Sequence, residues 1–391
     1  MSIEQNLRAK LQQRADAGNL RQLSLSPPGI TDFCSNDYLG LARNPTLHQR
    51  IQAAYATANT TANGATGSRL ISGNSLHYNA LERTLAGLFG AEKALIFNAG
   101  YTANTAILSA IPQRGDTIIF DEYSHASLKE GARLSFAQRF AFRHNDLADL
   151  EKKLQKATGD VFVVAESVYS MDGDFAPLAD LLVCCEKYGA NLIWDEAHST
   201  GTRGKGGNGL ACELALEHRT FARIYTFGKG PGVHGACIAG SGLLIDYLIN
   251  FARPLIYTTA LPLHSLVSIA QSFAYLGEYP DLQDQLHAVI QRFRQQLNAY
   301  PALMPHFIHS LSPIQAIKTG GNARTRKLAG QLQTAGFDVR PILSPTVREG
   351  EERLRICLHV YNTEAETAAL LHQLNTIFHE EKHVYPVAVQ S

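Results

Sequence analysis

Short apolar runs alternate with helical patterns through the middle of the chain, and this alternation constrains the fold more than any other feature. The apolar runs that read as strands lie at residues 93–98, 116–120, 138–142, 161–167, 191–195, 223–227 and 236–243. Helical periodicity fills the spaces between the first five runs, at residues 101–111, 124–135, 145–157 and 178–189. This order predicts an α/β fold whose central sheet is mostly parallel and covered by helices on both faces. Ligands bind beyond the carboxyl ends of the strands in such sheets, so residues that follow a strand are candidate site residues.

The pattern changes near residue 265, which indicates a second, smaller domain. Helices are expected at 264–278, 281–299, 323–335 and 363–379, with short strands among them. We therefore predict three segments: an N-terminal helix and short strand over residues 1–48, a large domain over 49–265 and a small C-terminal α/β domain over 266–391. Residues 1–20 read as an amphipathic helix with Leu7, Leu11 and Leu20 near one face. The last residues, 384–391, are expected to form a surface extension.

The composition is that of an ordinary globular protein and argues against several classes of partner. Of the 391 residues, 45% are hydrophobic and 18% are charged, and the formal net charge is zero. A chain without a basic excess is a poor candidate for binding nucleic acid or an anionic membrane. The sequence has no apolar run of roughly 18 residues that could span a membrane, and its polar start lacks the apolar stretch of a signal peptide. The six cysteines form no C-x-x-C pair, which favours free thiols in a reducing cytoplasm over disulfides or a metal site.

The segment NLIWDEAHSTG, residues 191–201, carries the strongest chemical signal. Its apolar strand ends at Asp195, and His198 follows three residues later. A carboxylate at a strand end can hold a cationic ring nitrogen, although a helix N-cap is an equally ordinary use for it. DEAH also occurs in helicases, but those need a G-x-x-x-x-G-K-[ST] phosphate loop. The Gly-Lys pairs at 204–205 and 228–229 are each followed by glycine, which argues against a helicase.

A second segment, RIYTFGKGPGVHGACIAG at residues 223–240, places a lysine just after a strand. The strand delivers Thr226, and Lys229 follows between two glycines. A nucleophilic lysine must be positioned tightly and have its pKa lowered, and glycines let a cofactor approach the backbone closely. A lone GKG is also compatible with an ordinary solvated lysine.

Two further strand ends complete a pattern. Gly100 and Tyr101 open a helix just after a strand, and free N–H groups at a helix start favour a phosphate, although an ordinary strand–helix turn would look the same. His125 also follows a strand and could stack on a flat ring, or serve as a structural or capping residue. A lysine, a strand-end carboxylate, a helix start and a histidine together match pyridoxal-5′-phosphate (PLP) chemistry.

The chain resembles the α-oxoamine synthase family of fold-type I PLP enzymes over nearly its whole length. The similar blocks, in the family's order, are FCSNDYLGL, GATGSRLISGN, FNAGYTAN, DEYSHASL, ESVYSMDGD, DEAHSTG, TFGKG and SPTVREGEERLRICLH. The resemblance implies a homodimer that condenses a small amino acid with an acyl thioester and releases carbon dioxide. TFGKG and RLRICLH favour the biotin-pathway branch, which joins L-alanine to a pimeloyl thioester on coenzyme A or acyl carrier protein. Glycine C-acetyltransferase, 5-aminolevulinate synthase and serine palmitoyltransferase are the alternative branches.

Reactions outside the family remain as alternatives. An aminotransferase or aldolase of the same fold would need no acyl thioester. A non-catalytic partner subunit would have lost the cofactor lysine, whereas this chain keeps Lys229, Asp195 and His198. A PLP-binding storage or regulatory protein would bind the cofactor without turnover.

The resemblance also implies roles for matching positions. Lys229 would join the cofactor as a Schiff base, Asp195 would pair with its ring nitrogen, His198 would contact its 3-hydroxyl and His125 would stack on its ring. The other cofactor contacts implied are Gly100, Tyr101 and Thr226 at the phosphate, Ser170 near the ring, and Thr258 or Thr259 at the cofactor of the other subunit. Those implied for the substrates are Asn36 and Arg355 at the amino-acid carboxylate and Arg21 at the acyl group.

The chain departs from the family pattern in several places. Only about ten residues separate Arg21 from the DFCSNDY segment, so the N-terminal hairpin is shortened. Leu343 stands where an arginine often precedes SPTV, and Pro231 and His234 are unusual in the lysine loop. After the strand that carries Arg355, LHVYNT replaces the more common T-A-x-H-T.

Overall fold

The computed structural model describes residues 2–23, 25–26, 28–58 and 62–384. The chain divides into two compact units. We call Asn36–Ser170 with Phe175–Gln285 the sheet unit, and Met1–Ser35, Met171–Asp174 and Leu286–Ser391 the terminal unit. The predicted borders at residues 48 and 265 stay a prediction, whereas the structure groups the N-terminal residues with the C-terminal ones.

A seven-stranded sheet, counted over the described residues, forms the centre of the sheet unit in the order β2-β8-β7-β6-β5-β3-β4. Its strands are β2 (Lys93–Phe97), β3 (Thr117–Asp121), β4 (Gln138–Phe142), β5 (Val161–Glu166), β6 (Asn191–Asp195), β7 (Ala222–Thr226) and β8 (Ala236–Gly240). Neighbouring strands are parallel except at β8, which runs antiparallel to both β2 and β7. The predicted α/β fold with a mostly parallel sheet is therefore confirmed.

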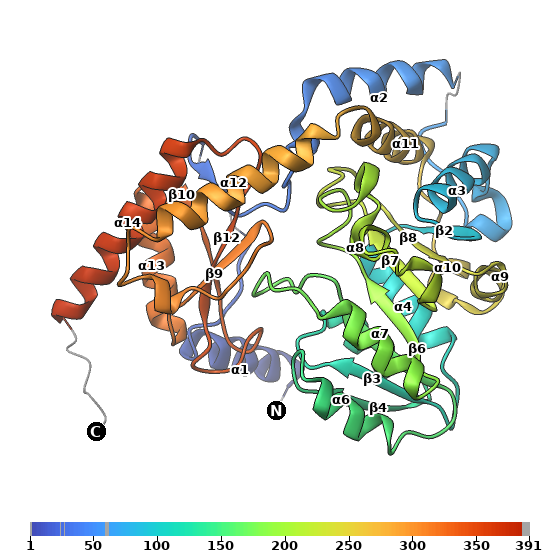
Figure 1. Ribbon diagram of the computed structural model, residues 1–391, viewed down its shortest axis with the longest axis horizontal. Helices are drawn as coiled ribbons and strands as arrows, with labels where there is room; N and C mark the ends of the chain where they lie inside the picture. Colours follow the sequence, from blue (N-terminus) through green and yellow to red (C-terminus); the bar gives the residue numbers. More distant parts are fainter. Residues whose placement is uncertain (1, 24, 27, 59–61, 385–391) are drawn as a thin grey trace. The chain divides into compact units, whose positions relative to one another are not determined.

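Helices cover both faces of this sheet, as Figure 1 shows. On one face, α4 (Gly100–Ala110), α5 (Ala126–Leu134) and α9 (Gly242–Phe251) bury their apolar sides against the strands. On the other, α6 (Leu147–Leu154) and α7 (Leu178–Lys187) do the same. Successive strand residues point to opposite faces, so Ile193 joins the first core and Trp194 the second. Both faces are buried, which explains why the strands read as nearly continuous apolar runs.

The remaining helices of the sheet unit include one that the sequence analysis did not predict. This helix, α2 (Pro45–Thr57), begins where the Asn44 side chain accepts a hydrogen bond from the Leu47 N–H at 2.9 Å, with Pro45 in its first turn. The others are α3 (Leu76–Leu88), α8 (Gly209–Glu213), α10 (Arg253–Ile256) and α11 (Leu263–Glu278), while α12 (Asp281–Leu297) contains the border between the units.

The terminal unit contains two small sheets among its described residues. One is antiparallel, in the order β11 (Arg340–Ile342), β12 (Arg353–Cys357), β9 (Ile314–Lys318), and in the other β1 (Thr31–Asp32) pairs with β10 (Phe337–Asp338) in parallel. Its helices are α1 (Ile3–Asp16), α13 (Asn322–Thr334) and α14 (Glu364–Val384). The helix predicted over residues 1–20 thus ends at Asp16, so Leu20 lies outside it, and Leu7 and Leu11 are exposed. Of the extension predicted over residues 384–391, Val384 is the last residue of α14 and the rest lies outside the described residues.

No helix in the described part of the chain combines the length and the apolar character needed to cross a bilayer.

Candidate functional site

The alternation of side chains along the strands brings the candidate residues of the sheet unit to one face. Ile193 and Ile224 belong to the core on the α4 and α5 side, so Asp195 and Thr226, two residues further along each strand, face the same way. Glu166 at the end of β5 pairs in register with Asp195. These side chains therefore meet where α4 and α5 begin.

Asp195 is a buried carboxylate with a fixed orientation. It is 3% exposed, its Oδ2 accepts a hydrogen bond from Asn104 Nδ2 at 2.7 Å, and its Oδ1 accepts one from the Ala197 N–H at 2.9 Å. Asn104 lies on α4 and also donates to Ser127 Oγ at 2.9 Å. The sequence analysis did not identify Asn104, although it lies four residues after Gly100 and so on the same side of that helix.

His125 contacts the same network from the start of α5. Its Nδ1 accepts a hydrogen bond from the Ser127 N–H at 3.2 Å and lies 2.6 Å from Ser127 Oγ. The residue thus does cap a helix, as its ordinary interpretation predicted. Desolvation lowers the pKa of His125 below its usual value, and the charges of Lys229 and Lys129 add to this while Asp195 opposes it. Stacking on a cofactor ring stays a prediction.

Glu166 is a second buried carboxyl group that the sequence analysis did not identify. It is 2% exposed, and it accepts a hydrogen bond from the backbone N–H of His125. Burial, together with the neighbouring charge of Asp195, raises its pKa well above the usual value, while the His125 N–H and the charge of Lys229 act in the opposite direction. The raised pKa favours the neutral acid form of Glu166.

His198 is buried and held by Tyr38. The Tyr38 hydroxyl donates to Asn36 Oδ1 at 3.0 Å and lies 2.8 Å from His198 Nδ1. This contact joins two predicted site residues, Asn36 and His198, through a tyrosine that the sequence analysis did not single out.

Lys229 is half-buried in a loop that packs tightly on its surroundings. Gly232 has φ of +68°, and a Cβ there would lie 2.4 Å from the Ala42 N atom. The loop therefore requires glycine at this position. The charge of Lys229 acts to lower the pKa of both His125 and Glu166.

The start of α4 lies directly against the end of β7. A Cβ on Gly100 would lie 2.4 Å from the Thr226 Cγ2 atom, so only glycine allows this approach. No described side chain caps α4, which leaves the N–H groups of its first turn available. Tyr101, the next residue, is 52% exposed. The uncapped start of this helix suits a phosphate group.

Not all of the predicted residues belong to the hydrogen-bonded group around Asp195, His125 and Glu166. Ser170 and Thr258 are half-buried, and Thr259 is exposed while its carbonyl accepts from Asn98 Nδ2 at 2.9 Å. Arg21 and Arg355 belong to the terminal unit. Arg21 is exposed and lines a cavity of about 530 Å³ with residues 341–346.

Arg355 is half-buried on β12. Its Nη1 lies 3.0 Å from Cys357 Sγ.

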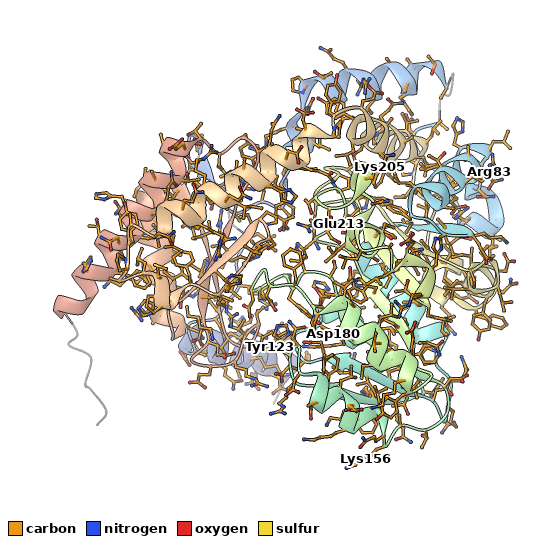
Figure 2. All side chains as sticks on the ribbon, in the orientation of Figure 1. Arg83, Tyr123, Lys156, Asp180, Lys205 and Glu213 are labelled. Carbon is orange, nitrogen blue, oxygen red and sulfur yellow. The ribbon has the colours of Figure 1, made fainter. Side chains whose placement is uncertain are left out.

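Glu196, the second residue of the DEAH segment, has a structural role. Its carboxylate accepts from the N–H groups of Leu210 at 3.0 Å and Ala211 at 2.7 Å. It thereby ties the residues just after β6 to the start of α8. This helix ends at Glu213, which Figure 2 labels together with Lys205. Burial raises the pKa of Glu196.

The residues present fit PLP. The cofactor has a ring nitrogen that a buried carboxylate can hold, an aldehyde that an amine can bind and a phosphate that suits an uncapped helix start. Asp195, Lys229 and the Gly100–Thr226 approach supply these three features on one face of the sheet unit.

Known proteins resemble the chain over most of its length. The family model for class I and II aminotransferases matches residues 28–374. An 8-amino-7-oxononanoate synthase from Emericella nidulans is 39% identical over 96% of this chain and 95% of its own. A serine palmitoyltransferase from S. paucimobilis with a bound PLP–myriocin aldimine superimposes with a TM-score of 0.85 at 25% identity, covering 96% and 97% of the two chains. An 8-amino-7-oxononanoate synthase from Francisella tularensis has a TM-score of 0.78 at 28% identity, covering 91% and 99%.

Proposed function

The chain belongs to the class I and II aminotransferase family and, within it, to the 8-amino-7-oxononanoate synthases, and we propose that it performs their reaction with PLP as cofactor. In this reaction L-alanine and a pimeloyl thioester give 8-amino-7-oxononanoate, carbon dioxide and the free thiol, a step of biotin biosynthesis. The observation that carries the proposal is the oriented, buried Asp195 with His125 and Lys229 nearby at the carboxyl ends of the strands.

Two side chains of the sheet unit, Asp195 and Lys229, have different roles at the cofactor. When bound, PLP supplies an electron sink for the bonds at the amino-acid Cα. Asp195, held by Asn104 and the Ala197 N–H, keeps a proton on the ring nitrogen, which makes that sink effective. Lys229 would hold the cofactor through its amine and would act as the general base that takes the Cα proton of alanine.

Other residues hold the reacting groups in place. Asn36 and Arg355 would hold the alanine carboxylate, because a bidentate arginine contact fixes which Cα bond is cleaved. Arg21 would contact the acyl substrate. The remaining cofactor contacts we propose are His198 at the 3-hydroxyl, Ser170 near the ring and Gly100, Tyr101 and Thr226 at the phosphate.

We also propose a homodimer in which Thr258 or Thr259 reaches the partner's cofactor. Large apolar side chains are exposed close to these threonines, at Leu70, Ile71 and Tyr257, and Ser68 forms a β-bridge with Thr259. Exposed apolar side chains gathered in one region are typical of an interface.

We further propose a cytoplasmic location, which fits the cysteines, because all six are free. Acyl carrier protein is a candidate donor of the acyl group.

A second candidate function is the condensation of a different amino acid, such as serine or glycine, with a different acyl thioester. The structural likeness to serine palmitoyltransferase favours this candidate. One experiment separates the two. The purified protein with PLP is offered alanine, glycine or serine against short, pimeloyl and palmitoyl thioesters, and the released thiol is recorded. We expect the highest kcat/KM for alanine with the pimeloyl thioester, and a clear preference for another pair would replace the proposal.

A further inference from the structure

The loop after β12 departs from the family pattern, and its histidine has an unusual set of partners. His359 is completely buried in the terminal unit, two residues after the end of β12. The segment Asp32–Ser35 lies against it, because the Cys357 N–H donates to the Phe33 carbonyl at 2.8 Å. This segment leads directly into Asn36, and β12 carries Arg355, the residues that we propose for the substrate carboxylate.

The Nδ1 atom of His359 faces an oxygen that can only accept a hydrogen bond. It lies 3.0 Å from Asn362 Oδ1, and the backbone N–H of His359 donates to this same oxygen at 2.9 Å. The Asn362 Nδ2 donates to the Asp32 carbonyl at 3.2 Å, so both ends of the amide are fixed. Turning the amide over would put its NH₂ against the His359 N–H and its oxygen against a carbonyl. Nδ1 therefore carries a hydrogen.

The Nε2 atom of His359 also faces a pure acceptor. It lies 2.9 Å from the backbone carbonyl of Ser35 and 3.2 Å from Ser35 Oγ, whose own hydrogen goes to Asp32 Oδ2 at 2.7 Å. A carbonyl cannot donate, so Nε2 must carry a hydrogen as well. A histidine with hydrogens on both ring nitrogens is an imidazolium.

The surroundings supply a compensating negative charge. Burial acts to raise the pKa of Asp32, but the N–H groups of Ser35 and Cys34, the Ser35 hydroxyl and His359 together lower it well below the usual value. Tyr361 donates to Asp32 Oδ2 at 3.0 Å, and its ring stacks on His359 with centroids 4.6 Å apart. A cation stacked on an aromatic face is stabilised by the ring.

The other ionisable groups near this segment, on the described residues, include the thiols of Cys34 and Cys357, Arg355, and the ion pair of Arg340 with Asp338 beside Cys34. Burial raises the pKa of Cys34, and it raises that of Cys357 to about 11, so both stay neutral thiols near neutral pH. Arg355 on β12 is a permanent cation.

We propose that His359 is an imidazolium that serves as a positioning residue, tying the Asp32–Ser35 segment before Asn36 to the end of the strand that carries Arg355. The hydrogen bonds of a charged His359 to the Ser35 carbonyl and to Asn362 Oδ1 fix the backbone of this segment more strongly than those of a neutral histidine could, because charge-assisted hydrogen bonds are about twice as strong as neutral ones. The consequence for alanine binding rests on the proposed function, whereas the charge of His359 does not.

The charge is tested directly by NMR on the PLP-loaded enzyme with ¹⁵N-labelled histidine. We expect the His359 ring to show two protonated nitrogens at about pH 7.5, where a free histidine is mostly neutral. The signal is assigned as the one lost in His359→Gln or, if that variant does not fold, as the one shifted in Tyr361→Phe. A ring with a single protonated nitrogen at this pH would overturn the proposal, whatever the enzyme's substrates.

The positioning role is tested by kinetics of His359→Gln, with His372→Gln as a matched control at an exposed site on α14. We expect the KM for alanine to rise about tenfold, with less than about a twofold change in kcat and in the KM of the pimeloyl thioester. The control should change neither. If NMR shows an imidazolium in the wild type but His359→Gln has unchanged alanine kinetics, the positioning role is refuted. A variant that loses stability without a change in the KM for alanine would refute it as well.

Discussion

Asn104 links two of the functional side chains through a single amide group. Its Nδ2 donates to both Asp195 and Ser127, and Ser127 contacts His125. The orientation of the strand-end carboxylate and of the histidine therefore depends on one residue of α4. A hydrogen bond to a charged group contributes about 1.5–3 kcal/mol, so this residue should influence catalysis measurably.

Asn104→Ala should lower kcat/KM for alanine about tenfold to a hundredfold, because Asp195 loses one of its two orienting hydrogen bonds. Ser109→Ala, a substitution near the other end of α4, serves as control and should leave the rate within about twofold. Steady-state kinetics with released thiol as readout decide this. Equal rates for both variants would mean that Asp195 keeps its function without the amide.

Lys229→Ala should abolish turnover and the visible absorbance of the lysine-bound cofactor. The chain offers a matched control in Lys205, which also stands between two glycines and is exposed (labelled in Figure 2). Lys205→Ala should keep both properties, because a solvated lysine contributes neither a nucleophile nor a base. Normal product formation by Lys229→Ala would refute the role given to this lysine.

Glu166→Gln should change how stability depends on pH. The folded protein holds the Glu166 proton to a higher pH than the unfolded chain does, because burial raises the pKa. Above the usual glutamate pKa the unfolded state therefore binds fewer protons, and the stability of the wild type falls as the pH rises towards the folded pKa. Glutamine does not titrate, so the free energy of unfolding of the variant lacks this pH dependence. Urea unfolding should therefore show the stability of the variant rising relative to that of the wild type as the pH increases over this range. A difference that is constant from about pH 5 to pH 8 would contradict a raised pKa.

At the scale of elements, the approach of α4 to β7 decides where a phosphate can bind. The helix begins without a side-chain cap, and its first residue has no room for a Cβ beside Thr226. The local sequence explains the helix, but the glycine is explained only by the strand that lies against it.

Gly100→Ala should weaken PLP binding, measured by cofactor fluorescence, because the added methyl group displaces Thr226 or the helix start. Thr226→Ser removes the methyl group that it would meet and keeps the hydroxyl, so the double variant should recover much of the affinity. Gly87→Ala on α3 is the control, since no described atom lies within 4 Å of the added Cβ. It should raise helix stability by about 1 kcal/mol or less and leave PLP binding unchanged. A Gly100→Ala protein with normal affinity would show that the helix start does not hold the phosphate.

At the scale of the whole molecule, the terminal unit is assembled from segments that are far apart in the sequence. Its short middle piece, Met171–Asp174, interrupts the sheet unit and carries Asp172, which forms an ion pair with Arg353 on β12. Arg353 is 1% exposed. The same piece contains part of the ESVYSMDGD block, and the first of the two aspartates of this block, Asp172, therefore has a structural partner.

Asp172→Asn should lower the free energy of unfolding by about 3 kcal/mol, because it removes the nearer counter-charge of the buried Arg353 and leaves Glu351 at 3.8 Å. Glu151→Gln removes the partner of Lys187 from an exposed pair and should have little effect, since solvent screens such pairs. Urea denaturation of both variants compares the two. Equal stabilities would mean that the Asp172–Arg353 pair adds nothing to the terminal unit.

The strands, most of the helices and the strand-end positions followed from the sequence alone. Periodicities of two and 3.6 residues are local, and the strands of the central sheet end within one residue of the predicted ends, except β8, which ends at Gly240 instead of residue 243. Asp195, Thr226 and Lys229 could therefore be placed at or just after strand ends. The family blocks added the cofactor and the reaction class.

The partners of these residues were decided by the tertiary structure. Asn104, Glu166 and Tyr38 contact the predicted residues from elements that are separate in the sequence, and His125 proved to be a helix cap as well. Polar partners are chosen by which helix packs on which face and in which register the strands pair. No local pattern encodes that choice, because it depends on the burial of the whole unit at once.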